Sequence, residues 1–189
     1  MKARLITWAA LLRGINVGGS NVIKMADLRG SFTRLGLGDV ATLIASGNVV
    51  FRTALPRETL EQTIEAALSK QYAYESRIVL RTLEELASLV AAAPKRWGTD
   101  ARRKYNVLFL RPAVDSADVL DGLSPKAGIE QVVWRPGALL WSALTREVTR
   151  TSMAKLSSKP LYQELTVRNW NTTQKLLALM KTVDAEARR

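Results

Sequence analysis

The segment VATLIASGNVVF at Val40–Phe51 sets the fold of this chain. Two apolar runs, at 40–44 and 49–51, flank the four residues Ala45-Ser46-Gly47-Asn48. A Gly-Asn pair between two β-branched, apolar runs is typical of a tight turn in a β-hairpin. The segment therefore predicts two antiparallel strands, and the rest of the fold is read outward from them.

Helices are predicted on both sides of this hairpin. Apolar residues recur at helical spacing over 25–35 and again over 60–68, where Pro56 opens the helix. Short apolar runs at 5–12 and 77–80 predict two further strands. The order over the first half is thus β-α-β-β-α-β.

A third helix follows, because Thr82 and Glu85 have the spacing of a capping box. The same order then recurs, with strands over 105–110, 129–134, 138–144 and 164–167, short helices over 115–123 and 152–158, and a final helix from about Thr172. We expect an α+β fold of two tandem ferredoxin-like units, each an antiparallel sheet with helices on one face. The predicted division is a first unit over 1–94 that carries both Gly-Asn motifs, a basic connector over 95–103, and a second unit over 104–189 that ends in the C-terminal helix.

The composition excludes several kinds of chemistry. The 189 residues include no His and no Cys, so a Ser-His-Asp triad, a thiolate nucleophile, a disulfide and a zinc site built on His or Cys are all excluded. No D-x-D motif or carboxylate pair indicates a dedicated metal site. The apolar run at 5–12 ends at Arg13 and is too short for a membrane span, which needs roughly 20 apolar residues. We expect a cytoplasmic protein without a membrane segment.

The net charge of +11 favours an anionic partner. Residues 95–111 hold six basic residues and one acid, and residues 146–189 hold nine basic and four acidic residues. Such a charge attracts phosphate-bearing molecules, with a strong dependence on salt. A basic surface that serves solubility, or an Arg-rich proteome, explains the same excess without any ligand.

Five segments resemble a bacterial family called domain of unknown function 1697. They are LLRGINVGGSN at Leu11–Asn21, KMADL at Lys24–Leu28, LGLGDVAT at Leu35–Thr42, LIASGNVVF at Leu43–Phe51 and LTVRNWNTTQKL at Leu165–Leu176. The resemblance implies a two-part α+β fold and implies no activity. It marks as pattern positions Arg13, Asn16, Gly18, Gly19, Ser46, Gly47, Asn48, Arg168, Asn169, Asn171 and Thr172. Leu43 departs from the family, which usually has an aromatic residue there.

The predicted topology brings the two Gly-Asn segments together. In a β-α-β-β-α-β unit the end of the first strand lies beside the start of the third, so Arg13, Asn16, Gly18 and Gly19 face Ser46, Gly47 and Asn48. A glycine-rich turn that enters a helix offers free backbone N–H groups to an anion, and Arg13 or Lys24 adds a counter-charge. Gly14 and Gly19 have the spacing of a P-loop, but Ser20 and Asn21 replace its Lys and Ser/Thr, so the P-loop interpretation fails. The alternative is that these residues form only turns and caps.

A second cluster lies in VRNWNTTQKL. Asn171 and Gln174 are predicted to cap the last helix, which leaves Arg168 and Asn169 as candidate ligand contacts. The expected topology places Arg168 near Arg102, Arg103 and Lys104 as a positive shelf. Trp170 is interpreted as a packing residue at the start of the helix.

Three functions follow from these observations. The first is binding of a small anionic, phosphate-bearing molecule at the edge formed by Arg13, Asn16, Gly18, Gly19, Lys24, Ser46, Gly47 and Asn48. The second is RNA binding through the basic surface, with base stacking on Tyr105, Phe109 and Trp141 if these face solvent. The third is a transferase acting on phosphate esters through Arg13, Lys24 or Arg168 with an external Mg²⁺. The sequence leaves the cofactor, the oligomeric state and enzyme activity undefined.

Overall fold

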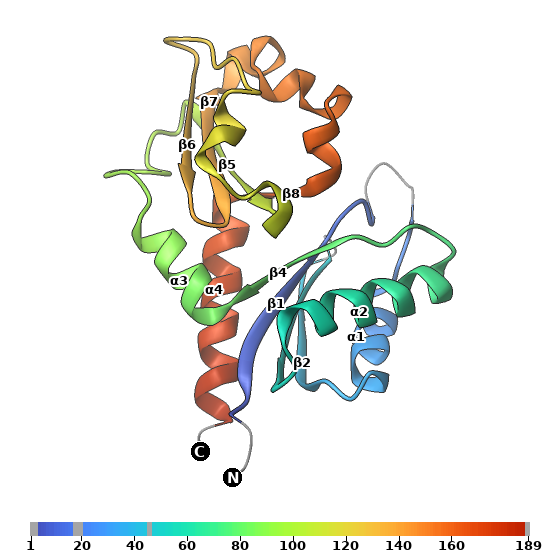
Figure 1. Ribbon diagram of the computed structural model, residues 1–189. Coiled ribbons are helices and arrows are strands. Elements are labelled where there is room, and N and C mark those ends of the chain that lie inside the picture. The colour runs from blue at the N-terminus through green and yellow to red at the C-terminus, as the bar shows by residue number, and fades with distance from the viewer. Residues whose placement is uncertain (1–3, 17–20, 45–46, 188–189) are drawn as a thin grey trace. The chain divides into compact units, whose positions relative to one another are not determined.

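The computed structural model describes residues 4–16, 21–44 and 47–187. It contains two four-stranded antiparallel sheets with helices, which confirms the predicted α+β fold of tandem ferredoxin-like units (Figure 1). The strand order is β2-β3-β1-β4 in the first sheet and β6-β7-β5-β8 in the second. Both sheets therefore place their first and third strands in the centre, as a ferredoxin-like unit does.

The first sheet is built from the hairpin outward. Its elements are β1 (Ile6–Leu12), α1 (Met25–Arg34), β2 (Gly38–Leu43), β3 (Asn48–Thr53), α2 (Arg57–Tyr72) and β4 (Ile78–Thr82). The helical spacing of apolar residues places Leu28 and Phe32 of α1 and Ile64 of α2 in the core, where each is fully buried. The ring of Phe32 packs on Phe51 of β3 with centroids 5.5 Å apart. Burial of these side chains holds α1 and α2 on one face of the sheet.

The opposite face of this sheet contacts the end of α4 (Trp170–Glu186). Side chains alternate along β1, so Thr7 faces away from the core residue Trp8. The Thr7 hydroxyl donates a hydrogen bond of 2.8 Å to Asp184 of α4. The sequence analysis expected helices on one face only and had no signal for this contact.

Helix α3 (Leu83–Ala91) begins as predicted. The Glu85 N–H donates to Thr82 Oγ1 at 3.1 Å, and the Thr82 N–H donates to Glu85 Oε2 at 2.9 Å. These two bonds are the reciprocal pair of a capping box, so this prediction is confirmed. Partial burial raises the pKa of the Glu85 carboxyl. The hydrogen bond from the Thr82 N–H and the charge of Arg57 lower this pKa by more, so the net shift is downward.

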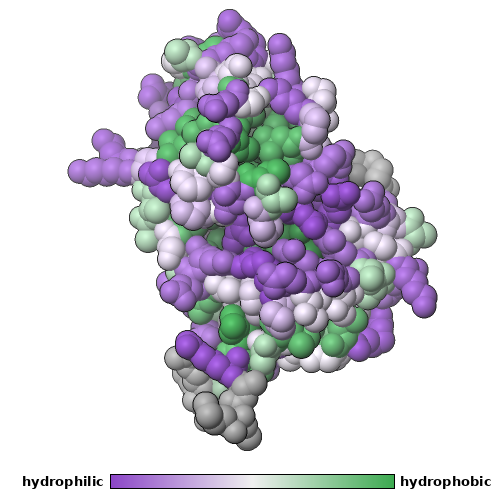
Figure 2. All heavy atoms as spheres, in the orientation of Figure 1, coloured by the Kyte–Doolittle hydropathy of each residue, from purple (hydrophilic) through white to green (hydrophobic). Residues whose placement is uncertain are grey.

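The second sheet contains β5 (Arg103–Leu110), β6 (Glu130–Arg135), β7 (Ala138–Leu144) and β8 (Leu165–Asn169). The helices predicted over 115–123 and 152–158 are short 3-10 helices, η2 (Ala117–Leu120) and η4 (Met153–Ser158). Three further 3-10 helices flank them: η1 (Pro112–Val114), η3 (Thr145–Arg150) and η5 (Pro160–Glu164). Prolines and a run of Thr, Ser and Val residues in these segments disfavour longer α-helices. Apolar side chains of this unit are partly visible in a hollow between the short helices (Figure 2).

One buried carboxylate joins these short helices to the sheet. Glu130 of β6 accepts hydrogen bonds from Trp141 Nε1 at 2.8 Å and from the Lys126 N–H at 3.0 Å. It also accepts bonds from the Ser152 N–H at 2.6 Å and the Ser152 hydroxyl at 3.0 Å. Burial raises the pKa of Glu130, yet these donors together lower it below its ordinary value.

The chain divides into two compact units. Unit 1 contains Met1–Leu86 and Lys175–Arg189, and unit 2 contains Ala87–Gln174. Both boundaries therefore fall inside helices, α3 and α4. The segment 95–103, which the sequence analysis treated as a connector, lies within unit 2.

Candidate functional site

The two Gly-Asn segments meet in unit 1 as the topology predicted. The register pairs Leu11 of β1 with Asn48 of β3, and the Leu12 N–H donates to the Gly47 carbonyl at 2.8 Å. The end of β1 and the start of β3 thus form one edge, which we call the loop edge; of the described residues it contains 13–16, 21–24, 44, 47 and 48. Gly18, Gly19 and Ser46 lie outside the described residues.

Five of the eleven described residues at the loop edge have a left-handed backbone conformation. Gly14, Asn16, Asn21, Ile44 and Gly47 all have φ between +48° and +71°. For a β-branched residue such as Ile44 this conformation is uncommon and costs about 1–3 kcal/mol. Strain of this kind gathers at ligand sites, which makes the edge a candidate site.

The Asn side chains at this edge hold the backbone. Asn16 pairs with Ile23 twice, through Nδ2 to the carbonyl at 3.0 Å and through Oδ1 to the N–H at 2.8 Å. Asn48 is fully buried and donates to the Leu43 carbonyl at 3.1 Å. These bonds support the interpretation of both amides as turn and loop supports.

Cations and apolar side chains lie around the edge. Lys24 is exposed at the start of α1, and half-buried Arg13 follows directly after β1, where its N–H donates to the Arg77 carbonyl at 3.0 Å. Val22 and Ile44 are 73% and 50% exposed, although both are large apolar residues. The edge therefore offers both positive charge and apolar contact.

The second predicted cluster is organised differently. Arg168 is only 7% exposed, and its guanidinium donates to Thr166 Oγ1 at 2.9 Å and to the Val167 carbonyl at 2.8 Å. Burial lowers its pKa to about 10. Arg168 therefore does not add to a positive shelf with Arg102, Arg103 and Lys104, because its register partner is Val107 and its side chain is buried.

Asn169 is the residue that caps α4. Its Oδ1 accepts the Thr172 N–H at 2.7 Å, so the predicted cap at Asn171 is wrong by two residues. Helix α4 begins at Trp170, two residues before Thr172, where the sequence predicted its start. Trp170 is buried against Gly98, which confirms its packing role.

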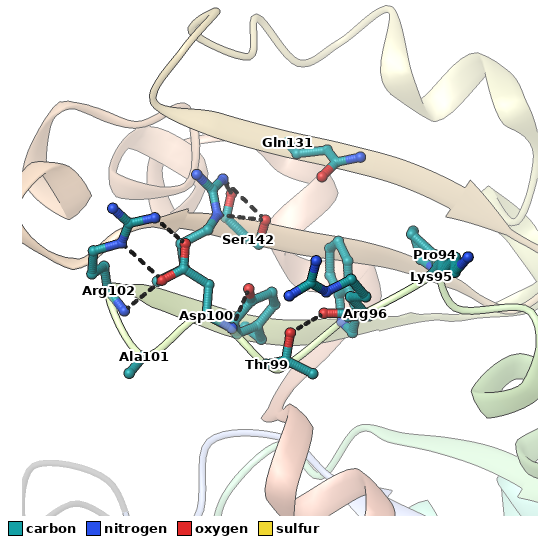
Figure 3. A pocket seen from close by; sticks show the side chains of 12 residues that line it. Pro94, Lys95, Arg96, Thr99, Asp100, Ala101, Arg102, Gln131 and Ser142 are labelled. Atoms are coloured by element: carbon teal, nitrogen blue, oxygen red, sulfur yellow. Dashed lines mark hydrogen bonds and ion pairs between the residues drawn. The ribbon is translucent and has the colours of Figure 1, made fainter.

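A pocket of roughly 610 Å³ lies in unit 2 between the segment 94–102 and one face of the second sheet (Figure 3). We call it the unit 2 pocket. Four cationic side chains line it: Lys95, Arg96, Arg102 and Arg103. Asp100 is the one carboxylate among its lining residues. Polar groups from Thr99, Tyr105, Gln131 and Ser142 complete the polar part of the lining.

Two of the arginines in the unit 2 pocket are held by the protein. Arg102 binds Asp100 through two bonds of 3.0 Å, from Nε to Oδ1 and from Nη2 to Oδ2, and this arginine lowers the pKa of the Asp100 carboxyl to about 2. Arg103 donates to Ser142 Oγ at 3.1 Å and to the Ser142 carbonyl at 3.2 Å. The guanidinium of Arg103 is therefore held against the sheet before any ligand arrives, whereas the side chain of Arg102 is 85% exposed.

The loop that carries Lys95 and Arg96 is rigid at its centre. Gly98 has φ +83°, and a Cβ there would lie 2.6 Å from Trp170 Cδ1. Trp97 is buried and meets Tyr105 edge-on, with ring centroids 5.1 Å apart. Arg96 has a left-handed φ of +63°, at a cost of about 1 kcal/mol. Sequence reasoning noted the basic run over 95–111 and missed the pocket, because the loop turns back onto the sheet through these tertiary contacts.

The chain shares its fold and motifs with known proteins. The family described as protein of unknown function (DUF1697) matches residues 5–141. The chain belongs to this family. A solved structure of a conserved bacterial protein from Streptococcus pneumoniae is 29% identical, with a TM-score of 0.81, over 94% of this chain and 99% of that one. Membership of the DUF1697 family confirms the resemblance inferred from the motifs.

A second solved structure is much less similar. The small subunit of acetolactate synthase from Thermotoga maritima matches with 16% identity and a TM-score of 0.23, over 88% of this chain and 97% of that one. A TM-score this low carries no argument about fold or function. No curated protein matches the chain significantly.

Two features are absent from the described residues. Among residues 4–16, 21–44 and 47–187, acidic side chains do not form a group of three or more that could hold a metal ion. Within the same part of the chain, every helix is too short or too polar to cross a membrane.

Proposed function

We propose that this protein binds a small anionic, phosphate-bearing molecule at the loop edge of unit 1. The observation that carries the proposal is the strained backbone of the β-branched Ile44, with φ +48°, beside four Gly and Asn residues that also have a left-handed φ. The topology brings these residues from two separate loops to one edge, and strained backbone of this kind is typical of ligand sites.

The side chains at the edge support a ligand with two chemical parts. Arg13 and Lys24 supply positive charge for a phosphate, as the sequence analysis expected. Val22 and Ile44 expose apolar surface that would contact an organic part of the ligand. Asn16 and Asn48 keep the two loops in place, as their bonds to backbone indicate.

The RNA alternative is weaker because its stacking groups are covered. Phe109 is fully buried and Trp141 is 3% exposed, so neither offers a face to a base. Tyr105 is half-buried beside Trp97. The transferase alternative loses Arg168 as an accessible charge, because that residue is buried.

Thermal melting against a panel of nucleotides, sugar phosphates, coenzymes and short RNAs tests the proposal. A ligand at about 100 times its dissociation constant adds about 2.7 kcal/mol, which raises Tm by about 5–11 °C. We expect a small phosphorylated hit that persists at high salt and is lost in Arg13→Ala. The matched control is Arg4→Ala, which removes an exposed cation just before β1 and should keep the shift.

Two results would count against the loop edge. One is a shift of equal size in Arg13→Ala, provided that the unliganded variant melts normally. The other is a panel in which only oligonucleotides stabilise the protein and their effect collapses in salt, which would favour RNA binding.

A further inference from the structure

We propose that the unit 2 pocket is a second, independent binding site, and that it takes a small polyanion with at least two phosphate or carboxylate groups. It is formed entirely by residues of Ala87–Gln174, whereas the loop edge belongs to Met1–Leu86.

The charge of the lining sets the charge of the ligand. Four cations and one carboxylate line the pocket, which leaves an excess of three positive charges. Asp100 is already bound to Arg102, and in the described part of the chain no carboxylate forms an ion pair with Lys95, Arg96 or Arg103. A ligand with one negative charge would leave most of this excess uncompensated, so two or more anionic groups fit best.

The loop backbone and one of the four cations of the pocket are held in place before a ligand binds. Gly98 lies so close to Trp170 that no side chain fits there, and this contact fixes the loop on which Lys95 and Arg96 stand. The bonds from Arg103 to Ser142 fix its guanidinium against the sheet. Fixed donors lose less conformational entropy when a ligand binds, which raises affinity.

The pocket also offers hydrogen-bond donors and sufficient space. Tyr105 Oη accepts the Asp100 N–H at 3.3 Å, so its own proton is available for an anionic oxygen. In Figure 3, Arg96, Asp100 and Arg102 lie along the loop, with Gln131 and Ser142 on the strands across from them. A volume of roughly 610 Å³ accommodates an organic polyanion as well as an inorganic one.

Isothermal titration calorimetry of the full chain with inorganic pyrophosphate and with citrate tests this site. The test variant is Lys95→Gln with Arg96→Gln, which removes two exposed cations from the lining. We expect it to weaken binding of both probes by about tenfold or more. The matched control is Lys104→Gln, an exposed cation in the same basic run that does not line the pocket, and we expect it to change affinity by less than about twofold.

Four results would overturn the proposal: no binding of either probe up to about 10 mM, equal loss in the control and test variants, unchanged affinity in the double variant, or loss of probe binding in Arg13→Ala alone. Arg13→Ala separates this site from the loop edge, since it should leave the binding of both probes intact. Loss of probe binding in Arg13→Ala alone would assign the anions to the loop edge. A near-native Tm for each variant shows that a change in binding is not a change in folding.

Discussion

Gly14 and Gly47 have nearly the same backbone conformation, with φ of +70° and +71°, in different surroundings. A Cβ on Gly47 would lie 2.7 Å from Ile15 Cδ1 and 2.9 Å from Leu12 Cβ, whereas a Cβ on Gly14 would meet nothing within 4 Å. The two positions therefore separate the cost of a left-handed conformation from the cost of a steric clash.

We expect Gly47→Ala to lower the free energy of unfolding by about 2–4 kcal/mol, from backbone strain plus overpacking. Gly14→Ala, which adds strain alone, should cost about 1–2 kcal/mol. Urea unfolding of the two variants measures the difference. Equal losses would mean that Ile15 and Leu12 move aside freely, and that the close contact is not what requires a glycine at position 47.

Residue types at this edge were predictable from sequence, and their partners were not. Gly14, Asn16, Asn21 and Gly47 all have the left-handed φ that glycine and asparagine tolerate. The burial of Asn48 and the backbone bonds of Asn16 depend on chain segments that come from elsewhere in the fold. Local sequence cannot tell a ligand-binding amide from one that closes a loop.

At the scale of elements, Glu130 ties β6 and β7 to the segment that contains η3 and η4. Its carboxylate accepts four bonds from Trp141, Lys126 and Ser152. In Glu130→Gln, an amide NH₂ would face donors where an oxygen accepts them now. We expect a loss of about 2–3 kcal/mol in the free energy of unfolding at pH 7, measured by urea denaturation.

Because the pKa of Glu130 is lowered, the free energy of unfolding also depends on pH in the acid range. A carboxyl whose pKa is lower in the folded state stabilises the fold above its unfolded pKa of about 4.3, and this contribution is lost as pH falls through the folded value. Wild type should therefore lose more stability than Glu130→Gln below about pH 4.3. If the free energy of unfolding of the two proteins changed with pH in the same way, the Glu130 carboxylate would not be what ties β6 and β7 to the segment with η3 and η4.

The order of the elements was predictable from the spacing of hydrophobic residues, whereas the type of each helix was not. Apolar periodicity found the eight strands and α1, α2 and α3, and the Thr82 and Glu85 pair located the start of α3. The segments around 115 and 155 combine a composition that disfavours long α-helices with long-range bonds: Asp115 Oδ2 accepts the Gly137 N–H at 2.8 Å, and Glu130 accepts the Ser152 N–H at 2.6 Å. Such long-range side-chain bonds override a short helical pattern.

At the scale of the whole molecule, unit 1 is completed by residues distant in sequence. Leu176, Leu177, Met180 and Val183 of α4 are each less than 9% exposed, and all four belong to unit 1. Loss of a buried Leu or Met side chain costs about 2–5 kcal/mol, and a domain is stable by about 5–15 kcal/mol. We expect a chain of residues 1–174 to lack a folded unit 1.

Amide hydrogen exchange checks this prediction, with the full chain as the control. Amides of β1, β3 and β4 should lose protection in the 1–174 chain. Retained protection in β1 and β3 would show that α1 and α2 alone stabilise the first sheet.

The placement of the unit boundaries inside α3 and α4 also constrains synthesis on the ribosome. Unit 1 contains Met1–Leu86 together with Lys175–Arg189, so the part translated first lacks a segment that is translated last. At about 5–20 residues per second, the 88 residues of Ala87–Gln174 take about 4–18 s to appear. During that interval the face of the first sheet that contacts α4 stays open to water or to a chaperone.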